Sequence, residues 1–249
     1  TGARILSSPV LDGGRLFFGD DNGQIFALRS GGTELKRAVF WDADYAKGAG
    51  FQSTEKLRDY LKKNGYDVLD ANGLMTFLND RKSDREPSVV VFAIDFLPKP
   101  LDVDKAGGSL LKNYLQSGGK VVWVGMPPEM WEKDLKTGQY PSMKIDREVT
   151  LSLLGVGHHR GNFDKNMAKA TPAGEQWGLD GWWLSSWSAD PETVSTVLAT
   201  DEMGLAAAWV KDFGGAPGTG FVRVPIAETP DGTPLNLDTI KTAAEYFPQ

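Results

Sequence analysis

The sequence predicts an α/β fold in which a doubly wound, mostly parallel sheet follows a short N-terminal β-meander. Two observations support the α/β part. From Leu35 onward, short apolar segments alternate with segments whose apolar residues recur at helical spacing, as expected for repeated strand–helix units. Residues 88–96 form an apolar run typical of a strand that is buried on both faces of a parallel sheet. Residues 1–34 instead contain only short apolar segments and glycine-containing turns, which predict the meander.

Length and composition narrow the possible functions. The 249 residues allow one large domain with a small appendage, and 41% hydrophobic residues are enough to build its core. The absence of cysteine excludes disulfides, thiolate zinc sites and a cysteine nucleophile. A net charge of −6 without any basic run argues against nucleic acid or an anionic membrane as a partner. We expect no membrane span, because no apolar stretch approaches the roughly 18 residues needed, and no signal peptide in the first residues.

The first part of the chain predicts three short strands, at residues 7–11, 15–19 and 24–28, joined by turns that contain glycine. This phrase resembles one repeat of the pyrroloquinoline-quinone-type β-propellers, with Arg29 in place of the usual aspartate of that family. A single propeller repeat buries too little apolar surface to be stable alone. We therefore expect residues 1–34 to be one unit of a longer parent chain that contains further domains.

Residues 35–125 predict the first strand–helix units of the sheet. Ser53 and Asn72 are predicted as helix N-caps, and Gly118-Gly119 as a helix stop. The expected strands lie at residues 36–41, 66–70, 88–96 and 120–125. The expected helices follow Ser53, follow Asn72 and end at Gly118.

The remainder of the chain has a less regular pattern. Short helices are expected at residues 127–135 and 146–154. Residues 155–190 are rich in glycine and tryptophan, so we expect binding loops or additional surface there. Strands are expected at residues 194–200, 205–212 and 221–226, and a closing helix at residues 238–247.

Two phrases of this α/β region are distinctive. The first runs from Leu110 to Gly125, where a helix with a central Tyr114 leads through Gly118-Gly119 into an apolar strand. The second runs from Val197 to Pro225 and contains Ala206-Ala207-Ala208-Trp209. Both resemble class I glutamine-amidotransferase-like domains, which include the trehalose-utilisation (ThuA-like) proteins, and together they relate residues 36–249 to these domains. The resemblance implies a flavodoxin-like sheet and suggests a carbohydrate as ligand.

The chain departs from these domains at the catalytic position. An active amidotransferase carries a nucleophilic cysteine in the turn after this strand. Here the turn is Gly125-Met126-Pro127-Pro128, without cysteine, serine or threonine, and the C-terminal His-x-Glu pair is also missing. Glutamine hydrolysis by the mechanism of these enzymes is therefore excluded, and we expect a non-catalytic domain.

Ligands of doubly wound sheets bind beyond the carboxyl ends of the strands. The side chains expected there are Asp42, Asp44, Tyr45, Asp95, Met126 and Glu129. We expect no cofactor, but three of these residues, Asp42, Asp44 and Asp95, supply oxygen ligands of the kind that a divalent cation prefers. The alternative function is thus a phosphatase- or esterase-like hydrolase that uses this acidic crevice with or without a metal. Carboxylates that only cap helices or face water are the simpler explanation.

Histidine and tryptophan provide the remaining candidates. His158 and His159 are adjacent and rarely chelate one ion; either residue would act as a general acid or base if it faced the crevice. Trp182 and Trp187 belong to a tryptophan-rich run whose indoles either stack on sugar rings or pack in the core, and packing is the commoner role.

These features together predict a non-catalytic amidotransferase-like domain. It is expected to bind a small molecule, with carbohydrate as one candidate, or another domain of its parent chain. The propeller-like repeat suggests a periplasmic or extracellular location, while a cytoplasmic one stays open.

Overall fold

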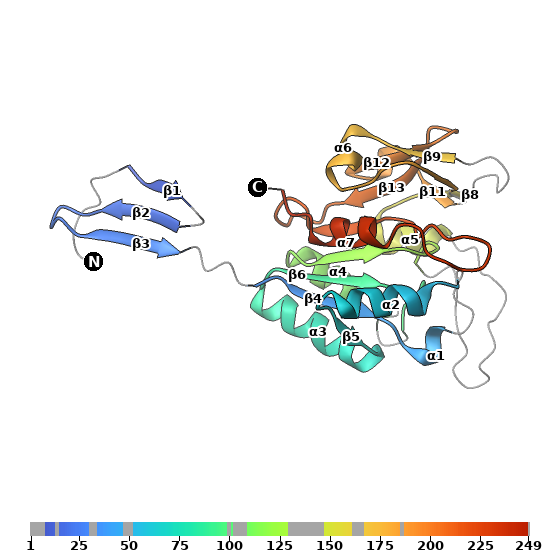
Figure 1. Ribbon diagram of the computed structural model, residues 1–249, viewed down its shortest axis with the longest axis horizontal. Coiled ribbons are helices and arrows are strands. Elements are labelled where there is room, and N and C mark those ends of the chain that lie inside the picture. The colour runs from blue at the N-terminus through green and yellow to red at the C-terminus, as the bar shows by residue number, and fades with distance from the viewer. Residues whose placement is uncertain are drawn as a thin grey trace. The chain divides into compact units, whose positions relative to one another are not determined.

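The computed structural model describes residues 8–12, 15–29, 34–46, 52–98, 101, 109–128, 147–160, 167–184 and 187–248 (Figure 1). The chain divides into two compact units, Thr1–Leu35 and Lys36–Gln249. The boundary predicted from sequence lies between residues 34 and 35. No helix of the described residues is long and apolar enough to cross a bilayer.

The first unit contains a three-stranded antiparallel meander, β1 (Val10–Asp12), β2 (Arg15–Gly19) and β3 (Ile25–Arg29). Asp20 shapes the turn between β2 and β3, because its Oδ1 accepts hydrogen bonds from the backbone N–H groups of Asn22 and Gln24, both at 3.0 Å. Val10 and Ile25 are 60% and 82% exposed. The meander therefore leaves large apolar side chains uncovered.

The second unit contains five parallel strands that confirm the predicted doubly wound fold. They are β4 (Lys36–Phe40), β5 (Asp67–Leu69), β6 (Ser88–Phe92), β7 (Lys120–Trp123) and β14 (Gly220–Arg223). Their spatial order is β5-β4-β6-β7-β14. Numbered along the chain this is 2-1-3-4-5, the flavodoxin-like order, whose topological switch point lies between β4 and β6.

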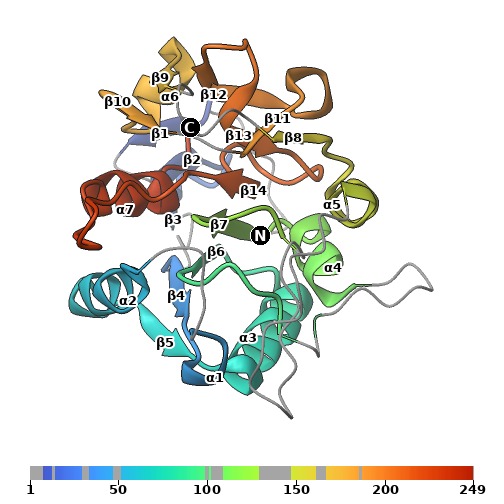
Figure 2. The same cartoon turned by 90° about the vertical axis from the view of Figure 1, so that its right-hand side faces the viewer.

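Helices cover both faces of the parallel strands, as Figure 2 shows. One face carries α2 (Thr54–Lys63) and α7 (Leu237–Glu245). The other face carries α3 (Ala71–Asp84), α4 (Leu110–Gln116) and α5 (Arg147–Leu154). The short α1 (Ala43–Ala46) follows β4 directly.

The sheet continues beyond β14 with antiparallel strands. In spatial order these are β13 (Ala206–Lys211), β12 (Thr196–Asp201), β9 (Met167–Ala170) and β10 (Trp182–Leu184). A side branch of β11 (Trp187–Ala189) and β8 (His158–Arg160) also pairs with β13. The helices α6 (Pro172–Gln176) and η2 (Pro191–Thr193) lie between these strands in the chain.

Strands β12, β13 and β14 lie where the sequence predicts strands at residues 194–200, 205–212 and 221–226, and β12 pairs with β13. The expectation of loops for residues 155–190 was incomplete, because four strands lie there. Each has only three or four residues, which is too short for a period of two to show in the sequence. The predicted helix at residues 127–135 falls mostly outside the described residues.

Two capping predictions differ from the structure. Asp70, rather than Asn72, is the N-cap of α3, and its Oδ1 accepts the N–H of Gly73 at 2.7 Å. Ser53 does stand at the N-cap of α2, but its side chain makes no capping hydrogen bond. The backbone N–H of Ser53 instead donates to the Glu228 carboxylate at 3.1 Å. The Glu228 carboxylate thus places a negative charge beside the start of α2, which the helix dipole favours.

A line of aromatic rings joins the two halves of the sheet. Phe92, Trp123, Phe221 and Trp209 come from adjacent strands, with successive ring centroids 4.9, 5.9 and 5.5 Å apart. All four side chains are completely buried. The parallel and antiparallel strands therefore share one continuous core.

The buried Lys120 holds the end of α7 against β7. Its Nζ donates to the carbonyl oxygens of Ala243 at 2.6 Å and Tyr246 at 2.7 Å. The rings of Trp177 and Phe247 each lie 4.5 Å from this nitrogen. Burial lowers the pKa of Lys120 to about 7.

This lowered pKa predicts a dependence of stability on pH. The unfolded chain keeps the Lys120 proton until about pH 10.5, whereas the folded chain loses it near pH 7. Between these values the unfolded state binds more protons, so the free energy of unfolding rises with pH by up to about 1.4 kcal/mol per unit. Urea unfolding of the wild type and Lys120→Met at pH 6, 7, 8 and 9 measures this. Above pH 7 we expect the free energy of unfolding of the wild type to rise relative to that of Lys120→Met. A difference between the two proteins that stays constant with pH would contradict the lowered pKa of Lys120.

Candidate functional site

The topological switch point brings the ends of β4 and β6 together, and the residues predicted for the crevice follow these strands. Asp42 and Asp44 come directly after β4, Asp95 follows β6, and Met126 follows β7. In an open α/β sheet this edge is the usual place for a ligand. The contacts of each side chain show whether it is available for one.

Asp42 organises the backbone at the edge of the sheet. Its Oδ1 accepts the N–H of Asp44 at 2.9 Å, and its Oδ2 accepts the N–H of Ala71 at 3.0 Å. The first contact supports α1 and the second joins it to the start of α3. Both carboxylate oxygens therefore have structural partners, as expected for an Asp in a turn.

Asp95 links the turns that follow β6 and β7. The side chain is completely buried, and its Oδ2 accepts the N–H of Met126 at 3.3 Å. The Met126 carbonyl in turn accepts the indole N–H of Trp123. The turn that would hold a nucleophile in an amidotransferase is thus fixed through its backbone and presents no hydroxyl or thiol.

The acidic candidates do not come together as a set of possible metal ligands. In the part of the chain that the structure describes, no group of three His, Asp or Glu side chains could hold an ion. Asp44 is exposed, and Tyr45 is buried with its ring 6.5 Å from that of Phe40. Glu129 lies outside the described residues. Asp42, Asp44 and Asp95 therefore do not form the cation site considered from the sequence.

The histidines lie on β8, in the antiparallel part of the sheet. His158 is buried, with its ring 5.8 Å from the ring of Trp209. The side chain of His159 lies outside the described part of the structure. The sequence contains no signal for this neighbourhood of His158, because β8 has only three residues and shows no strand pattern.

The tryptophan candidates favour packing over stacking on a ligand. Trp187 is 1% exposed, which leaves no free indole face. Trp177 is 7% exposed and contacts Tyr246, with ring centroids 4.7 Å apart. The Trp182 side chain falls outside the described residues.

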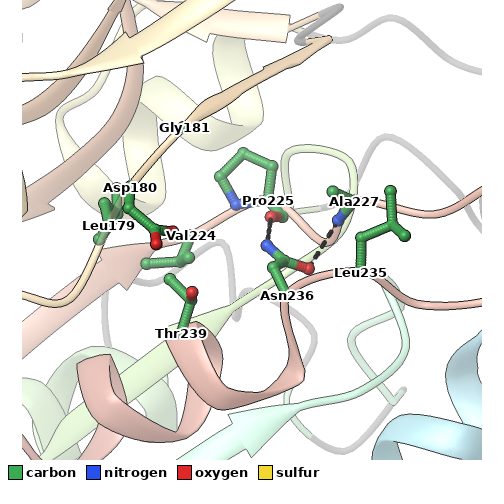
Figure 3. A pocket seen from close by; sticks show the side chains of 9 residues that line it. All are labelled: Leu179, Asp180, Gly181, Val224, Pro225, Ala227, Leu235, Asn236 and Thr239. Carbon is green, nitrogen blue, oxygen red and sulfur yellow. Dashed lines mark hydrogen bonds between the residues drawn. The ribbon is translucent and has the colours of Figure 1, made fainter.

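A cavity of about 150 Å³ lies at the carboxyl end of β14, beside the first turn of α7 (Figure 3). Three separated parts of the chain form it: the segment after α6, the end of β14 with the residues after it, and the start of α7. The cavity is lined by Leu179, Asp180, Gly181, Val224, Pro225, Ala227, Leu235, Asn236 and Thr239.

Asn236 fixes the shape of the cavity. Its Nδ2 donates to the Pro225 carbonyl at 2.9 Å and its Oδ1 accepts the N–H of Ala227 at 2.8 Å.

Two polar groups in this cavity have no hydrogen-bond partner among the described residues, namely the Asp180 carboxylate and the Thr239 hydroxyl. Figure 3 shows them approaching the same part of the cavity from opposite sides. The cavity continues into an open groove of about 460 Å³ that shares Leu179, Asp180 and Gly181 and adds Lys169 and Glu175. Apolar walls with a few converging polar groups are typical of sites for small molecules.

A model of the MJECL34 family matches residues 36–238, more than half of the chain. The chain belongs to the MJECL34 family. No curated protein and no solved structure matches it. The match covers most of the α/β unit of this MJECL34-family protein and leaves the meander outside it.

Only one wall of the cavity in this MJECL34-family domain lies in a region where the sequence predicts binding loops. The glycine-rich region 155–190 was expected to contain binding loops, and Leu179, Asp180 and Gly181 lie within it. Gly181 adopts a positive φ of 70°, which explains a glycine there. Asn236 and Thr239 gave no signal, because their importance depends on where α7 meets β14.

The hydrogen bonds of Asn236 predict a measurable contribution to stability. In Asn236→Ala, the Pro225 carbonyl and the Ala227 N–H lose their partner while half-buried, so we expect a loss of about 1–3 kcal/mol in the free energy of unfolding. Urea unfolding of both proteins measures this. Asn79→Ala is the matched control. The Asn79 side chain donates to the Met75 carbonyl and accepts from Lys82 Nζ, both on an exposed helix surface, so its loss should cost less than about 0.5 kcal/mol. Equal losses in both variants would contradict the role of Asn236.

Proposed function

We propose that this MJECL34-family domain is a non-catalytic relative of the class I glutamine-amidotransferase-like, ThuA-like domains. It binds a small hydroxylated molecule, with a sugar as the leading candidate, in the cavity beside α7. The observation that carries this proposal is the cavity beyond the last parallel strand, where the exposed Asp180 and the half-buried Thr239 lie beside apolar side chains and have no hydrogen-bond partner among the described residues. The flavodoxin-like strand order is consistent with the relationship.

The contacts at the switch point support a non-catalytic domain. Asp42 uses both oxygens for backbone N–H groups, and Asp95 is buried against Met126. The turn after β7 carries no side chain able to attack a carbonyl carbon. An acidic hydrolase would need these carboxylates to face a substrate or hold a metal, and they instead connect loops.

The chemistry of the cavity favours a hydroxylated ligand. A carboxylate accepts hydrogen bonds from hydroxyl groups, and the Thr239 hydroxyl both donates and accepts. The walls formed by Val224, Pro225 and Leu235 offer apolar contact to the C–H faces of a sugar ring. Leu235 is 66% exposed, so a bound ligand would also cover apolar surface that is now open to water.

The meander suggests a partner for the first unit. Its resemblance to a propeller repeat and its exposed Val10 and Ile25 fit a unit that packs against further repeats of a parent chain. In this proposal the α/β domain is one module of a larger extracytoplasmic protein. The partner contact concerns residues 1–34 and is separate from the cavity.

The cavity is tested by ligand binding. A glycan array or a thermal-shift screen identifies a sugar, and isothermal titration gives its affinity for the wild type and for Asp180→Asn. We expect a roughly 10- to 100-fold weaker Kd in the variant, because a hydrogen bond to a charged group is lost. Asp67→Asn, an exposed aspartate on β5 at the far edge of the sheet, is the control and should bind normally. Absence of any sugar binding, or equal affinities in all three proteins, would contradict the proposal.

The hydrolase alternative is tested by turnover. We expect only background hydrolysis of phosphate and carboxylate esters by the wild type, with or without Mg²⁺ or Mn²⁺, and no change in Asp42→Asn. Metal-dependent turnover that disappears in Asp42→Asn would establish the acidic crevice as an active site and remove the non-catalytic proposal.

A further inference from the structure

Arg223, the last residue of β14, is a buried cation without a counter-charge. It is 4% exposed, and burial lowers the pKa of its guanidinium to about 10. Nη1 donates to the Ala207 carbonyl at 2.6 Å, while Nε is buried and bonds nothing. No carboxylate of the described residues forms an ion pair with it. Buried charges in proteins are normally paired, so the unpaired guanidinium of Arg223 is unusual.

A bulge in the neighbouring strand positions the guanidinium. In the pairing of β12 with β13, Ala199 lies opposite Ala208 and Thr200 opposite Ala206, which leaves Ala207 as the extra residue. The Ala207 carbonyl, at this bulge, accepts the hydrogen bond from Arg223. Bulges of this kind redirect side chains and often lie next to functional sites.

Trp209 adds a second donor without an acceptor. It lies directly opposite Arg223 in the pairing of β13 with β14, so the two side chains share one face of the sheet. Its indole Nε1 is buried and has no hydrogen-bond partner. Trp123, which pairs with Arg223 from the other side, differs because its Nε1 donates to the Met126 carbonyl. Two neighbouring groups, both donors, therefore lack an acceptor in the same place.

We propose that Arg223 and Trp209 form a binding site for an oxyanion, the carboxylate or phosphate group of a small ligand. A guanidinium binds two oxygen atoms through its fork, and the indole N–H supplies a further hydrogen bond. Such a ligand provides both the missing counter-charge and the missing acceptor. The site is distinct from the sugar cavity, because neither Arg223 nor Trp209 lines that cavity.

Thermal unfolding in the presence of simple oxyanions tests this site. The wild type is measured in sodium phosphate, sodium acetate and sodium chloride at equal ionic strength and pH. At a tenfold excess over Kd we expect phosphate or acetate to raise Tm by about 3–6 °C more than chloride does. Arg223→Met should lose this difference. Arg58→Met is the matched control and should keep it, because Arg58 also lies near an indole, 4.0 Å from the Trp41 ring, but is paired with Asp59.

A spectroscopic measurement keeps the test valid if Arg223→Met folds poorly. The indole N–H resonance of Trp209, identified by its loss in Trp209→Phe, should shift in the wild-type protein on titration with phosphate or acetate and stay in place with chloride. Asp180→Asn should show the same shift, which separates this site from the sugar cavity. The proposal is overturned if neither oxyanion stabilises the wild type beyond chloride, if Arg223→Met retains the effect, or if the Trp209 resonance does not respond.

Discussion

The pairing of β14 on both sides is the constraint on which the rest of the α/β unit depends. Along one edge β14 runs parallel to β7, and along the other it runs antiparallel to β13. It therefore joins a flavodoxin-like half to an antiparallel half, and the stacked rings of Trp123, Phe221 and Trp209 bury the junction. Arg223 of the oxyanion site is the last residue of this strand, and Val224 and Pro225 of the sugar cavity follow directly after it. The end of β14 therefore lies next to both the apolar sugar cavity and the buried guanidinium of Arg223.

The parallel half was readable from the sequence because its signals are local and long. The run Val89–Phe92 is completely buried, and it could be recognised without knowledge of its neighbours. The end of the helix at Gly118-Gly119 could also be predicted from the sequence. Gly118 has a positive φ of 96°, and Gly119 lies against the ring of Tyr114, so both positions favour glycine. Such features depend on backbone geometry that a few adjacent residues determine.

The antiparallel half and the sites were not readable in the same way. Strands of three residues, such as Trp182–Leu184 and Trp187–Ala189, have no period to detect. Arg223 looks in the sequence like an ordinary polar residue of the strand expected at residues 221–226. The Ala207 carbonyl that it bonds lies at a bulge in the pairing of β12 with β13, which is not visible in the sequence. The acidic residues at the switch point were located correctly in the chain, but their partners are backbone N–H groups, and a residue type alone does not reveal its partner.

The groups that surround Lys120 lie partly beyond the segment that matches the family model. The similarity to the MJECL34 family ends at residue 238, within the first turn of α7. Yet the carbonyl of Tyr246 and the ring of Phe247, both beyond that helix, surround the ammonium group. A fragment that ends at residue 238 would lack the carbonyl oxygens and the Phe247 ring around Lys120 and would leave this buried ammonium group without these partners. The contacts that hold Lys120 thus extend past the segment by which the family is recognised.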